Sequence, residues 1–482
     1  MLFNSYQFAI YFPVVTLLYF LLGGKSRVFM LLAASCYFYM AFVPRYILIL
    51  AVLILVDYSA GILIENAAGR KRKLLLITSL VANIGMLGFF KYFNFLNGNV
   101  MSLAHWIGWN YPVPDLAIIL PIGLSFHTFQ SMSYTIEVYR GNFKAERSLP
   151  HFALYVLFYP QLVAGPIERP QNLLHQFYEK HPFDRDRVFE GLKWIAGGLF
   201  KKIVIADRLA VLVNTVYNDH RHYSGAQLLV ATYFFAIQIY CDFSGYTDIA
   251  RGAARVMGIG LMRNFNHPYL APSIEDFWKR WHISLTTWFR DYLYIPLGGN
   301  RVHAGRFYLN IAIVFLVSGL WHGANWTYVF WGGLHAVAFI FCAFTRRSRE
   351  KILAALRLER SVFIRCLGVF LTFNFVCLTW VFFRARSLSQ AFDIIGRIAS
   401  DFSLPTRLYA GLHYGQFILS IVLIVSLLAT ELLIRRSPSW LRAAFQYKLV
   451  RWSAYYLFIV ALVVLALLSP QQTAQTFIYF QF

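Results

Sequence analysis

Two apolar runs, AIVFLV (312–317) and YVFWGGLHAVAFIF (328–341), flank the polar stretch SGLWHGANW (318–326). Apolar runs of this kind recur along the chain and predict membrane-spanning helices, because a helix needs about 20 mostly apolar residues to cross the hydrocarbon core of a bilayer. A histidine at that depth costs free energy unless neighbouring groups hold it, so His322 is a candidate functional residue.

The composition of the whole chain agrees with a membrane protein. Of its 482 residues, 59% are hydrophobic and only 14% are charged, whereas about a quarter of an average soluble domain is charged. We therefore expect an all-α polytopic membrane protein, a single domain over residues 1–482 with about 11–13 transmembrane or re-entrant helices. The first run is predicted to be a span, since it lacks the basic start and small-residue cleavage site of a signal peptide. The candidate spans are 6–22, 28–43, 46–64, 74–96, 116–136, 150–164, 190–216, 226–243, 307–320, 325–345, 361–383, 414–434 and 453–468.

The charge balance predicts how the chain is oriented. The 44 Lys and Arg residues outnumber the 22 Asp and Glu residues, for a net charge of +22. No soluble basic recognition fold is visible, so we expect no nucleic-acid binding and interpret the excess as positive-inside loops that also attract anionic membrane lipid. Basic clusters at 70–73, 346–365 and 435–451 predict cytoplasmic loops, and residues 97–115, with no Lys or Arg, predict an outer loop. Both termini are then expected on the extracytoplasmic side.

The middle of the chain is less regular than the rest. The basic segments 137–149 and 301–306 are both expected inside, which requires an even number of crossings between them. Three weak spans lie there, so at least one is expected to enter the membrane without crossing it. Irregular backbone at membrane depth is tolerated only against protein or a water-filled cavity, and we therefore expect a cavity here. In the same region SIEDFWKRWHISLTTWF (273–289) predicts an amphipathic helix at the inner interface, with Ser273 as its N-cap.

A polar cluster follows the span at 226–243. In DFSGYTDIARG, the carboxylates of Asp242 and Asp248 could form a cation or proton path. They could equally cap the next helix, with Asp248 paired to Arg251 or Arg255. Both interpretations stay open.

The stretch QLVAGPIERP (161–170) places Glu168-Arg169 between prolines. Prolines restrict the backbone, so the stretch is interpreted as a rigid turn at the mouth of a cavity. The alternative is an ion pair within an ordinary loop.

The histidines His282 and His322 are the strongest candidates for chemistry. A lone histidine beside apolar residues is often a structural ring that hydrogen-bonds a helix backbone, and that interpretation stays open for both. Gly319 and Gly323 flank His322 and allow another chain or a ligand to approach closely, and Asn325 could orient the ring. No metal-ligand motif accompanies either histidine, so no metal site is expected. The five cysteines form no C-x-x-C pair and are interpreted as packing residues.

Extended motifs run in order along most of the chain. They are FKYFNF (90–95), LPIGLSFHTFQSMSYTIEVYRG (120–141), QLVAGPIERP, DFSGYTDIARGAARVMGI (242–259), NFNHPYLAPSIEDFWKRWHISLTTWFRDYLYIPLGGNR (264–301), SGLWHGANWTYVFWGGLHA (318–336) and FIYFQF (477–482). Together they resemble the membrane-bound O-acyltransferase family, in its alginate O-acetyltransferase-like bacterial branch. The chain departs from that pattern at His127, where a tyrosine is expected, a difference that does not touch the implied chemistry.

The resemblance implies a helical bundle around a central tunnel in the bacterial inner membrane. It implies that His322 is the active-site histidine and that His282 is a second family position near the same cavity. A neutral imidazole there can take a proton from a hydroxyl as that hydroxyl attacks a thioester. The implied donor is acetyl-CoA from the cytoplasm, with no permanently bound cofactor. Tunnel or supporting roles are expected for Asn325, Trp321, Asp242, Asp248 and Asp291.

The tail at 471–482 is expected to be extracytoplasmic. Its FIYFQF motif is either an aromatic belt at the bilayer edge or an acyl carrier. The second interpretation follows from similarity to the C-terminal motif of envelope-polymer acylation systems. By that similarity the phenol of Tyr479 receives the acetyl group with help from His322. It then hands the group to a periplasmic partner, a serine hydrolase-like transferase of the SGNH type that modifies a polysaccharide.

Three other functions are considered. A transporter or flippase would suit the broken helices and the carboxylates Asp242 and Asp248. A D-alanyl transferase acting on a cell-envelope polymer is a nearer relative. A purely structural membrane subunit agrees less well with polar residues clustered at depth. The acceptor polysaccharide stays open among alginate, cellulose and peptidoglycan.

Overall fold

The computed structural model describes residues 1–401, 403, 408–436, 438–470 and 477–478. These residues form α-, 3-10 and π-helices joined by loops, with no strand among them. Eight helices in this part of the chain are long and apolar enough to cross a membrane. The expected all-α polytopic membrane fold is therefore confirmed.

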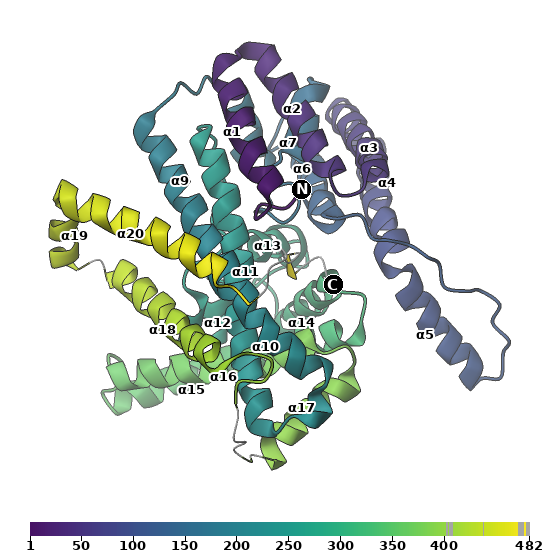
Figure 1. The fold of residues 1–482 in the computed structure, drawn as a ribbon. Helices are drawn as coiled ribbons and strands as arrows, with labels where there is room; N and C mark the ends of the chain where they lie inside the picture. The colour runs from purple at the N-terminus through teal and green to yellow at the C-terminus, as the bar shows by residue number, and fades with distance from the viewer. Residues whose placement is uncertain (402, 404–407, 437, 471–476, 479–482) are drawn as a thin grey trace.

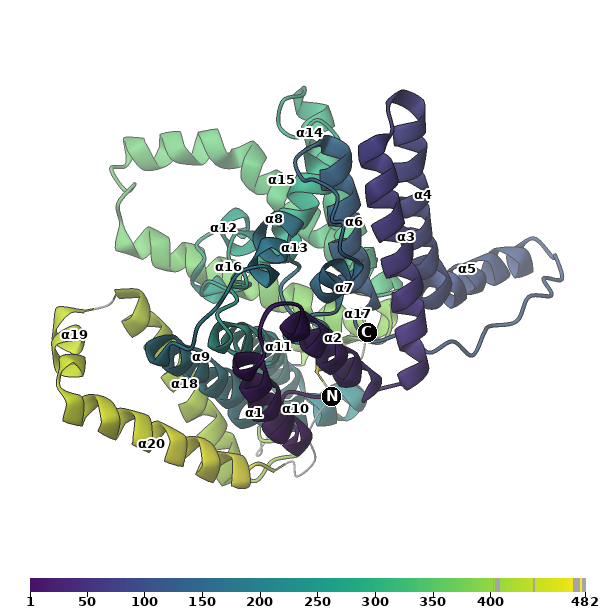
Figure 2. The same cartoon turned by 90° about the horizontal axis from the view of Figure 1, so that it is seen from above.

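The helices form three groups along the chain (Figure 1). The N-terminal group is α1 (Tyr6–Leu21), α2 (Gly24–Met40), α3 (Ile47–Asn66), α4 (Gly69–Leu87) and α5 (Phe93–Trp106). The middle group is α6 (Leu124–Arg140), α7 (Leu149–Leu157), α8 (Pro170–Leu173), α9 (Arg185–Leu199), α10 (Asp207–Asn218), α11 (Gly225–Val256), α12 (Ile274–Trp278) and α13 (Ile283–Phe289). The C-terminal group is α14 (Ala304–His322), α15 (Trp326–Ala355), α16 (Val362–Arg384), α17 (Leu388–Ser400), α18 (Tyr414–Arg436), α19 (Ser439–Gln446) and α20 (Lys448–Leu467). Figure 2 shows α11 inside the bundle, with α3 and α4 on one side and α18 to α20 on the other.

Helix α11 forms the core of the middle group. It runs for 32 residues, or about 48 Å at 1.5 Å per residue, and most of its side chains are buried. It packs against α9, where a Cβ atom on Gly245 would lie 2.7 Å from the carbonyl oxygen of Gly198. The predicted end of this span at residue 243 is wrong. The helix continues to Val256 because lysines on a neighbouring π-helical turn, η4 (Phe200–Ala206), pair with the carboxylates of Asp242 and Asp248.

The three weak spans predicted in the middle region, 150–164, 190–216 and 226–243, correspond to one short helix and two long helical segments. Helix α7 has nine residues, about 14 Å long, and is too short to cross a hydrocarbon core of about 30 Å. It is followed by buried, largely non-helical backbone at 158–169. Helices α9 and α10 join through η4 into one helical stretch over 185–218, which leaves two long segments, this one and α11. The length of α7 agrees with the expectation that at least one of the three weak spans does not cross, and which segment enters the membrane stays a prediction.

The predicted span at 116–136 begins later than expected. Residues 109–121 are not helical, and α6 starts at Leu124 after Gly123, whose backbone φ is +77°. Pro121 cannot donate a helical hydrogen bond, and the left-handed conformation suits glycine. The break shapes the wall of a cavity described below.

Two of the loops predicted to be cytoplasmic, those that contain 70–73 and 137–149, lie against each other, and the second also contacts Asp291. The Arg72 guanidinium donates to the carbonyl of Val138 at 3.1 Å, and the Ala145 amide donates to the Glu65 carboxylate at 3.1 Å. Arg140 donates to the carbonyl of Asp291 at 3.0 Å. This grouping of basic loops agrees with the predicted orientation, which itself stays a prediction.

Candidate active site

A tight hairpin of α14 and α15 positions His322. Helix α14 ends at His322, and Asn325 caps α15 by accepting a hydrogen bond from the Thr327 amide at 2.9 Å. The helices approach closely because a Cβ atom on Gly319 would lie 2.3 Å from the carbonyl oxygen of Tyr328. The expected close approach at Gly319 is confirmed, and the neighbouring helix makes it.

The second flanking glycine has a similar role. A Cβ atom on Gly323 would lie 2.1 Å from the ring of Tyr328. Both glycines thus bring α15 against the end of α14. The Asn325 side chain also donates to the carbonyl of Arg386 at 3.2 Å, so its contacts fix the backbone around His322, and a role in orienting the ring stays a prediction.

The imidazole of His322 lies in an aromatic enclosure. The residue is 4% exposed. Its ring centroid lies 5.0 Å from that of Trp321, 5.1 Å from that of Trp331 and 5.4 Å from that of Phe383. Water has little access to such a site, so interactions with charge that develops there are strong.

His282 lies beside His322, and it does so because the predicted helix at 273–289 is broken. Ser273 caps α12 as expected, but α12 ends at Trp278 and α13 begins only at Ile283. His282 is fully buried, with a left-handed φ of +44°, and its ring centroid is 6.4 Å from that of His322. The two sequence-predicted histidines are therefore brought together.

The break at His282 is held by the loop that precedes α12. The amide of Ile283 donates to the carbonyl of Asn264 at 2.9 Å, and the amide of Ser284 donates to the Asn264 side-chain oxygen at 3.1 Å. Trp278 and Trp281 are buried. The predicted amphipathic interface helix is wrong, because these contacts turn the segment into the protein interior.

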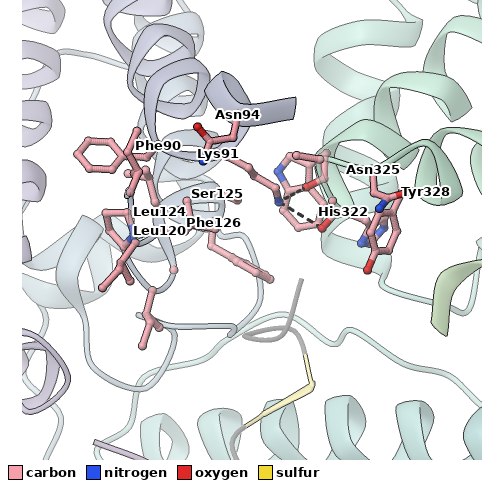
Figure 3. A pocket seen from close by; sticks show the side chains of 18 of the residues that line it. Phe90, Lys91, Asn94, Leu120, Leu124, Ser125, Phe126, His322, Asn325 and Tyr328 are labelled. Carbon is pink, nitrogen blue, oxygen red and sulfur yellow. Dashed lines mark hydrogen bonds between the residues drawn. The ribbon is translucent and has the colours of Figure 1, made fainter. Parts of the chain in front are cut away.

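An outer cavity of about 690 Å³ opens beside His322. Trp321 and Asn325 line it, together with 118–126 and 384–386. Lys91 reaches it from η2 (Gly88–Tyr92), a π-helical turn between α4 and α5. Figure 3 shows the Lys91 ammonium donating to the carbonyls that end α14. By the predicted orientation, these residues lie at the extracytoplasmic ends of the spans, and we call this cavity the outer cavity for that reason.

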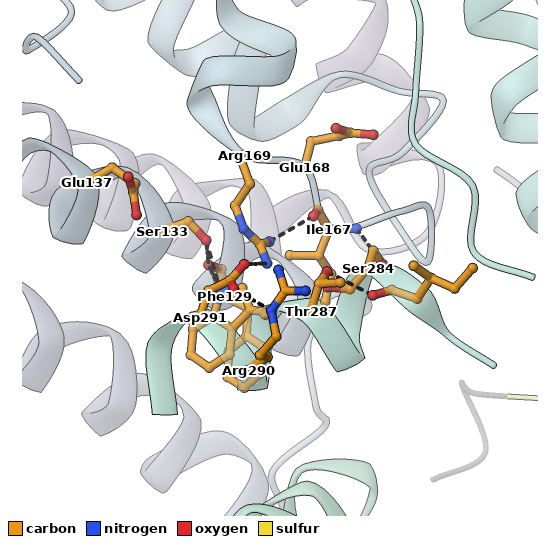
Figure 4. A network of polar contacts seen from close by, with 12 residues as sticks. Phe129, Ser133, Glu137, Ile167, Glu168, Arg169, Ser284, Thr287, Arg290 and Asp291 are labelled. Atoms are coloured by element: carbon orange, nitrogen blue, oxygen red, sulfur yellow. Dashed lines mark hydrogen bonds and ion pairs between the residues drawn. The ribbon is translucent and has the colours of Figure 1, made fainter. Parts of the chain in front are cut away.

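An inner cavity of about 600 Å³ opens among the loops predicted to be cytoplasmic. The ring of Tyr292 lies between two guanidinium groups, that of Arg140 at 5.1 Å and that of Arg169 at 5.0 Å from its centroid. Arg169 also pairs with Asp291 at 3.8 Å (Figure 4). The expected turn at the mouth of a cavity is confirmed at Arg169.

The neighbouring Glu168 does not pair with that arginine. Its carboxylate points away from Arg169 (Figure 4) and accepts hydrogen bonds from the Met262 amide at 2.6 Å and the Asn172 side chain at 2.5 Å. The loop ion pair considered for these two residues is therefore wrong. Because the buried carboxylate binds both the nearby Asn172 and the distant Met262, it holds the turn against the loop that precedes α12.

A column of aromatic rings connects the two cavities. It runs from Trp321 at the outer cavity through Phe129 and Trp288 to Tyr292 at the inner one. Successive ring centroids are 5.4, 3.8 and 5.1 Å apart. The indole of Trp288 donates to the carbonyl of Phe129 and to the Ser133 hydroxyl, each at 2.9 Å. These rings occupy the route along which a central tunnel was expected.

The predicted supporting carboxylates lie elsewhere on α11. Asp248 pairs with Lys201 at 2.8 Å and more loosely with Arg251 at 3.9 Å. Asp242 pairs with Lys202 at 2.7 Å and accepts a hydrogen bond from the Ile478 amide at 2.7 Å. Neither carboxylate lines the two cavities. The predicted carrier Tyr479 lies outside the described residues.

Sequence reasoning missed Lys91 and Lys202 as site residues. Each is a lysine within a predicted apolar span. A charge at that depth is a functional signal in itself. A search of every predicted span for charged residues would have found both lysines. Tyr292, in contrast, has no distinguishing sequence feature.

Comparison with known proteins identifies the family of the chain. The model of the membrane-bound O-acyltransferase family matches residues 142–382. A probable alginate O-acetylase of Pseudomonas aeruginosa is 40% identical over 395 residues, 81% of this chain and 73% of the relative. A peptidoglycan O-acetyltransferase of Helicobacter pylori is 36% identical over 82% of this chain and 79% of its own. A teichoic acid D-alanyltransferase of Bacillus subtilis is 28% identical over 57% of this chain and 71% of its own.

Proposed function

The chain belongs to the membrane-bound O-acyltransferase family and is a multi-pass O-acyltransferase, and from that premise we propose that it passes acetyl groups from cytoplasmic acetyl-CoA to an extracytoplasmic polysaccharide. The observation that carries the proposal is the buried His282–His322 pair, of which His322 lines an outer cavity that aromatic rings connect to an inner cavity containing Arg140 and Arg169. Such a site can receive a donor from one side and an acceptor from the other.

Acetyl is favoured over D-alanyl as the transferred group. Relatives named for O-acetylation match over about four fifths of this chain at 36–40% identity, whereas the D-alanyl relative matches over 57% at 28%. The polysaccharide acted on is not indicated by these names, because they include both alginate and peptidoglycan.

We assign the role of general base to His322. The attacking hydroxyl gives its proton to the neutral imidazole while its oxygen bonds to the thioester carbonyl carbon. The carbon–sulfur bond then breaks, and the departing thiolate takes the proton from the imidazolium. The buried aromatic enclosure supports this role, because it disfavours a resting positive charge on the ring and excludes competing water.

The inner cavity supplies a mouth for the donor. Coenzyme A is a polyanion, and the guanidinium groups of Arg140 and Arg169 line the cavity, where they pair with Glu137 at 3.2 Å and with Asp291 at 3.8 Å. Phosphates of the donor would have to share or displace these carboxylate partners. The acetyl end would then have to pass the rings of Phe129 and Trp288 to reach His322. Movement of those rings is thus part of the proposed cycle.

The acceptor at the outer cavity is proposed to be the phenol of Tyr479. Support comes from the preceding residue, Ile478, which is buried against α11. Acetylation of the phenol produces an aryl ester, an activated acetyl group. A periplasmic SGNH-type transferase would take that group on its serine and pass it to the polymer. By this scheme the protein lies in a bacterial inner membrane with both termini extracytoplasmic.

The test compares two buried histidines in the same hairpin. Protein in lipid nanodiscs, with its partner and polymer, is given radiolabelled acetyl-CoA, and label in the polymer is measured. His322→Gln should abolish transfer. His335→Gln is the control, since His335 hydrogen-bonds Trp278 and Thr379 and lies outside the proposed chemistry. Normal transfer by folded His322→Gln protein would reject the assignment, and transport without consumption of acetyl-CoA would favour the transporter.

A further inference from the structure

A buried charge cluster lies halfway along α11 and outside both cavities. The ammonium of Lys202 is 2.8 Å from the Asp207 carboxylate and 2.7 Å from the Asp242 carboxylate. All three residues are buried, with exposed fractions of 6–7% for Lys202 and Asp207 and 2% for Asp242. Two carboxyl groups share one ammonium, so neither has a cationic partner of its own. A buried carboxylate in this situation needs a further hydrogen-bond donor.

The C-terminal segment supplies that donor. The backbone amide of Ile478 donates to the second carboxylate oxygen of Asp242 at 2.7 Å. Phe477 is 2% exposed, and its ring centroid lies 5.4 Å from that of Phe243 and 4.8 Å from that of Tyr246. Two residues near the end of the chain are thus held against the middle of the longest buried helix.

The N-terminus completes the socket for Phe477. The ring of Phe3 also packs against Tyr246, with ring centroids 4.6 Å apart. Phe477, Phe3 and Lys202 line one small cavity. The socket therefore brings together both ends of the chain and the charge cluster.

The anchored segment lies close to the histidine pair. Phe243 follows Asp242 on α11, and its ring contacts both Phe477 and His282, the latter at 4.7 Å between centroids. His282 in turn lies 6.4 Å from His322. The ring of Phe243 therefore contacts Phe477 on one hand and His282 on the other.

We propose that Asp242, oriented by Lys202, is a positioning residue that anchors the C-terminal segment so that Tyr479 is presented to the histidine pair. The inference rests on the proposed acyl relay. An apolar socket alone would hold Phe477, but it would leave the backbone register free. A charge-assisted hydrogen bond to one amide fixes that register. The proposed role gives a function to the buried Lys202–Asp242 ion pair beside Ile478.

The decisive variant is Ile478→Pro, which removes the amide hydrogen and leaves the side chains of the cluster in place. Ile478→Val is the matched control, because it keeps the amide and most of the side chain. Hydrogen–deuterium exchange of the C-terminal peptide is measured in nanodiscs. Exchange should rise about tenfold or more in the proline variant, as expected for loss of a hydrogen bond to a charged group, and α11 and α14 should be unchanged. Equal tail exchange in the two variants would overturn the anchor.

A second set of variants links the anchor to the chemistry. Asp242→Asn keeps an acceptor oxygen but loses the charge, so it should also release the tail. Acetyl on Tyr479, read by mass spectrometry after one turnover, should fall about tenfold in both anchor variants. Combination with Tyr479→Phe should lower polymer acetylation no further. If Tyr479→Phe alone retained full transfer, the relay and the positioning role would fail together, whereas the exchange result would still decide the anchor separately.

Discussion

The ammonium of Lys91 donates hydrogen bonds to the main-chain carbonyls of Trp321 at 2.6 Å and His322 at 3.2 Å. These carbonyls end α14, where a helix has no partners of its own and carries a partial negative charge. Lys91 therefore stabilises the helix end that carries the proposed base. It reaches this position from η2, because the π-helical turn displaces the side chain from the regular α-helical face.

Replacement of Lys91 by methionine should impair both stability and transfer. The variant leaves two buried carbonyls without their donor, at a cost of about 1–3 kcal/mol. Misplacement of His322 should lower the maximal rate about tenfold or more, with little change in KM for the donor. Thermal unfolding and acetyl transfer are measured together. Lys193→Met is the control, since that lysine is exposed and lies near Tyr455. An unchanged rate in Lys91→Met would show that His322 is positioned by other contacts.

Two variants of His282 should separate its backbone from its imidazole. Asparagine tolerates the left-handed conformation, whereas alanine is strained there by about 1–2 kcal/mol. His282→Asn should therefore unfold at a higher temperature than His282→Ala. If the imidazole takes part in the chemistry, both variants should lose transfer about 100-fold or more. Full transfer by His282→Asn would instead identify a purely structural histidine.

The inner cavity should set affinity for the donor. Arg140→Gln should raise KM for acetyl-CoA about tenfold with kcat nearly unchanged, because the arginine would contact the distant phosphates and not the reacting carbonyl. The effect should vanish with acetyl-pantetheine, which has no phosphates. Arg349→Gln, at an exposed site, controls for general surface charge. An equal KM increase with both donors would contradict the phosphate contact.

Glu168 should make stability depend on pH. Burial raises the pKa of Glu168 from its ordinary 4.5 to about 7, against hydrogen bonds from Met262 and Asn172 that lower it. The folded state thus binds the proton more tightly than the unfolded state does. The stability contributed is fully present below pH 4.5 and is lost as the pH rises through about 7.

The midpoint temperature of thermal unfolding should accordingly decrease as the pH is raised from about 5 to about 7.5. Glu168→Gln should reduce this dependence of the midpoint temperature on pH. Glu179→Gln serves as control, because the Glu179 side chain is 54% exposed. The same slope in Glu168→Gln and wild-type protein would assign the dependence to other groups.

Several features of the fold followed from the chain alone because they depend on composition and local chemistry. The apolar runs predicted the helices, since lipid offers the backbone no other partner. Ser273 begins a helix as its hydroxyl chemistry predicts. The helix through 273–289 and the end of α11 were predicted wrongly. In both places a group distant in the sequence determines where the helix ends. Asn264 binds the backbone at the break beside His282, and Lys202 forms an ion pair with Asp242. Local periodicity contains no information about those partners.

The sequence by itself determined that this is a helical membrane protein, that it resembles a known acyltransferase family, and that His282 and His322 are the residues to examine. Only the tertiary structure decided that the two rings lie side by side, that Lys91 holds the end of α14, and that Ile478 is bound to Asp242. The physical reason is that a buried polar group must find a partner. In a membrane protein that partner is chosen by the packing of helices far apart in sequence.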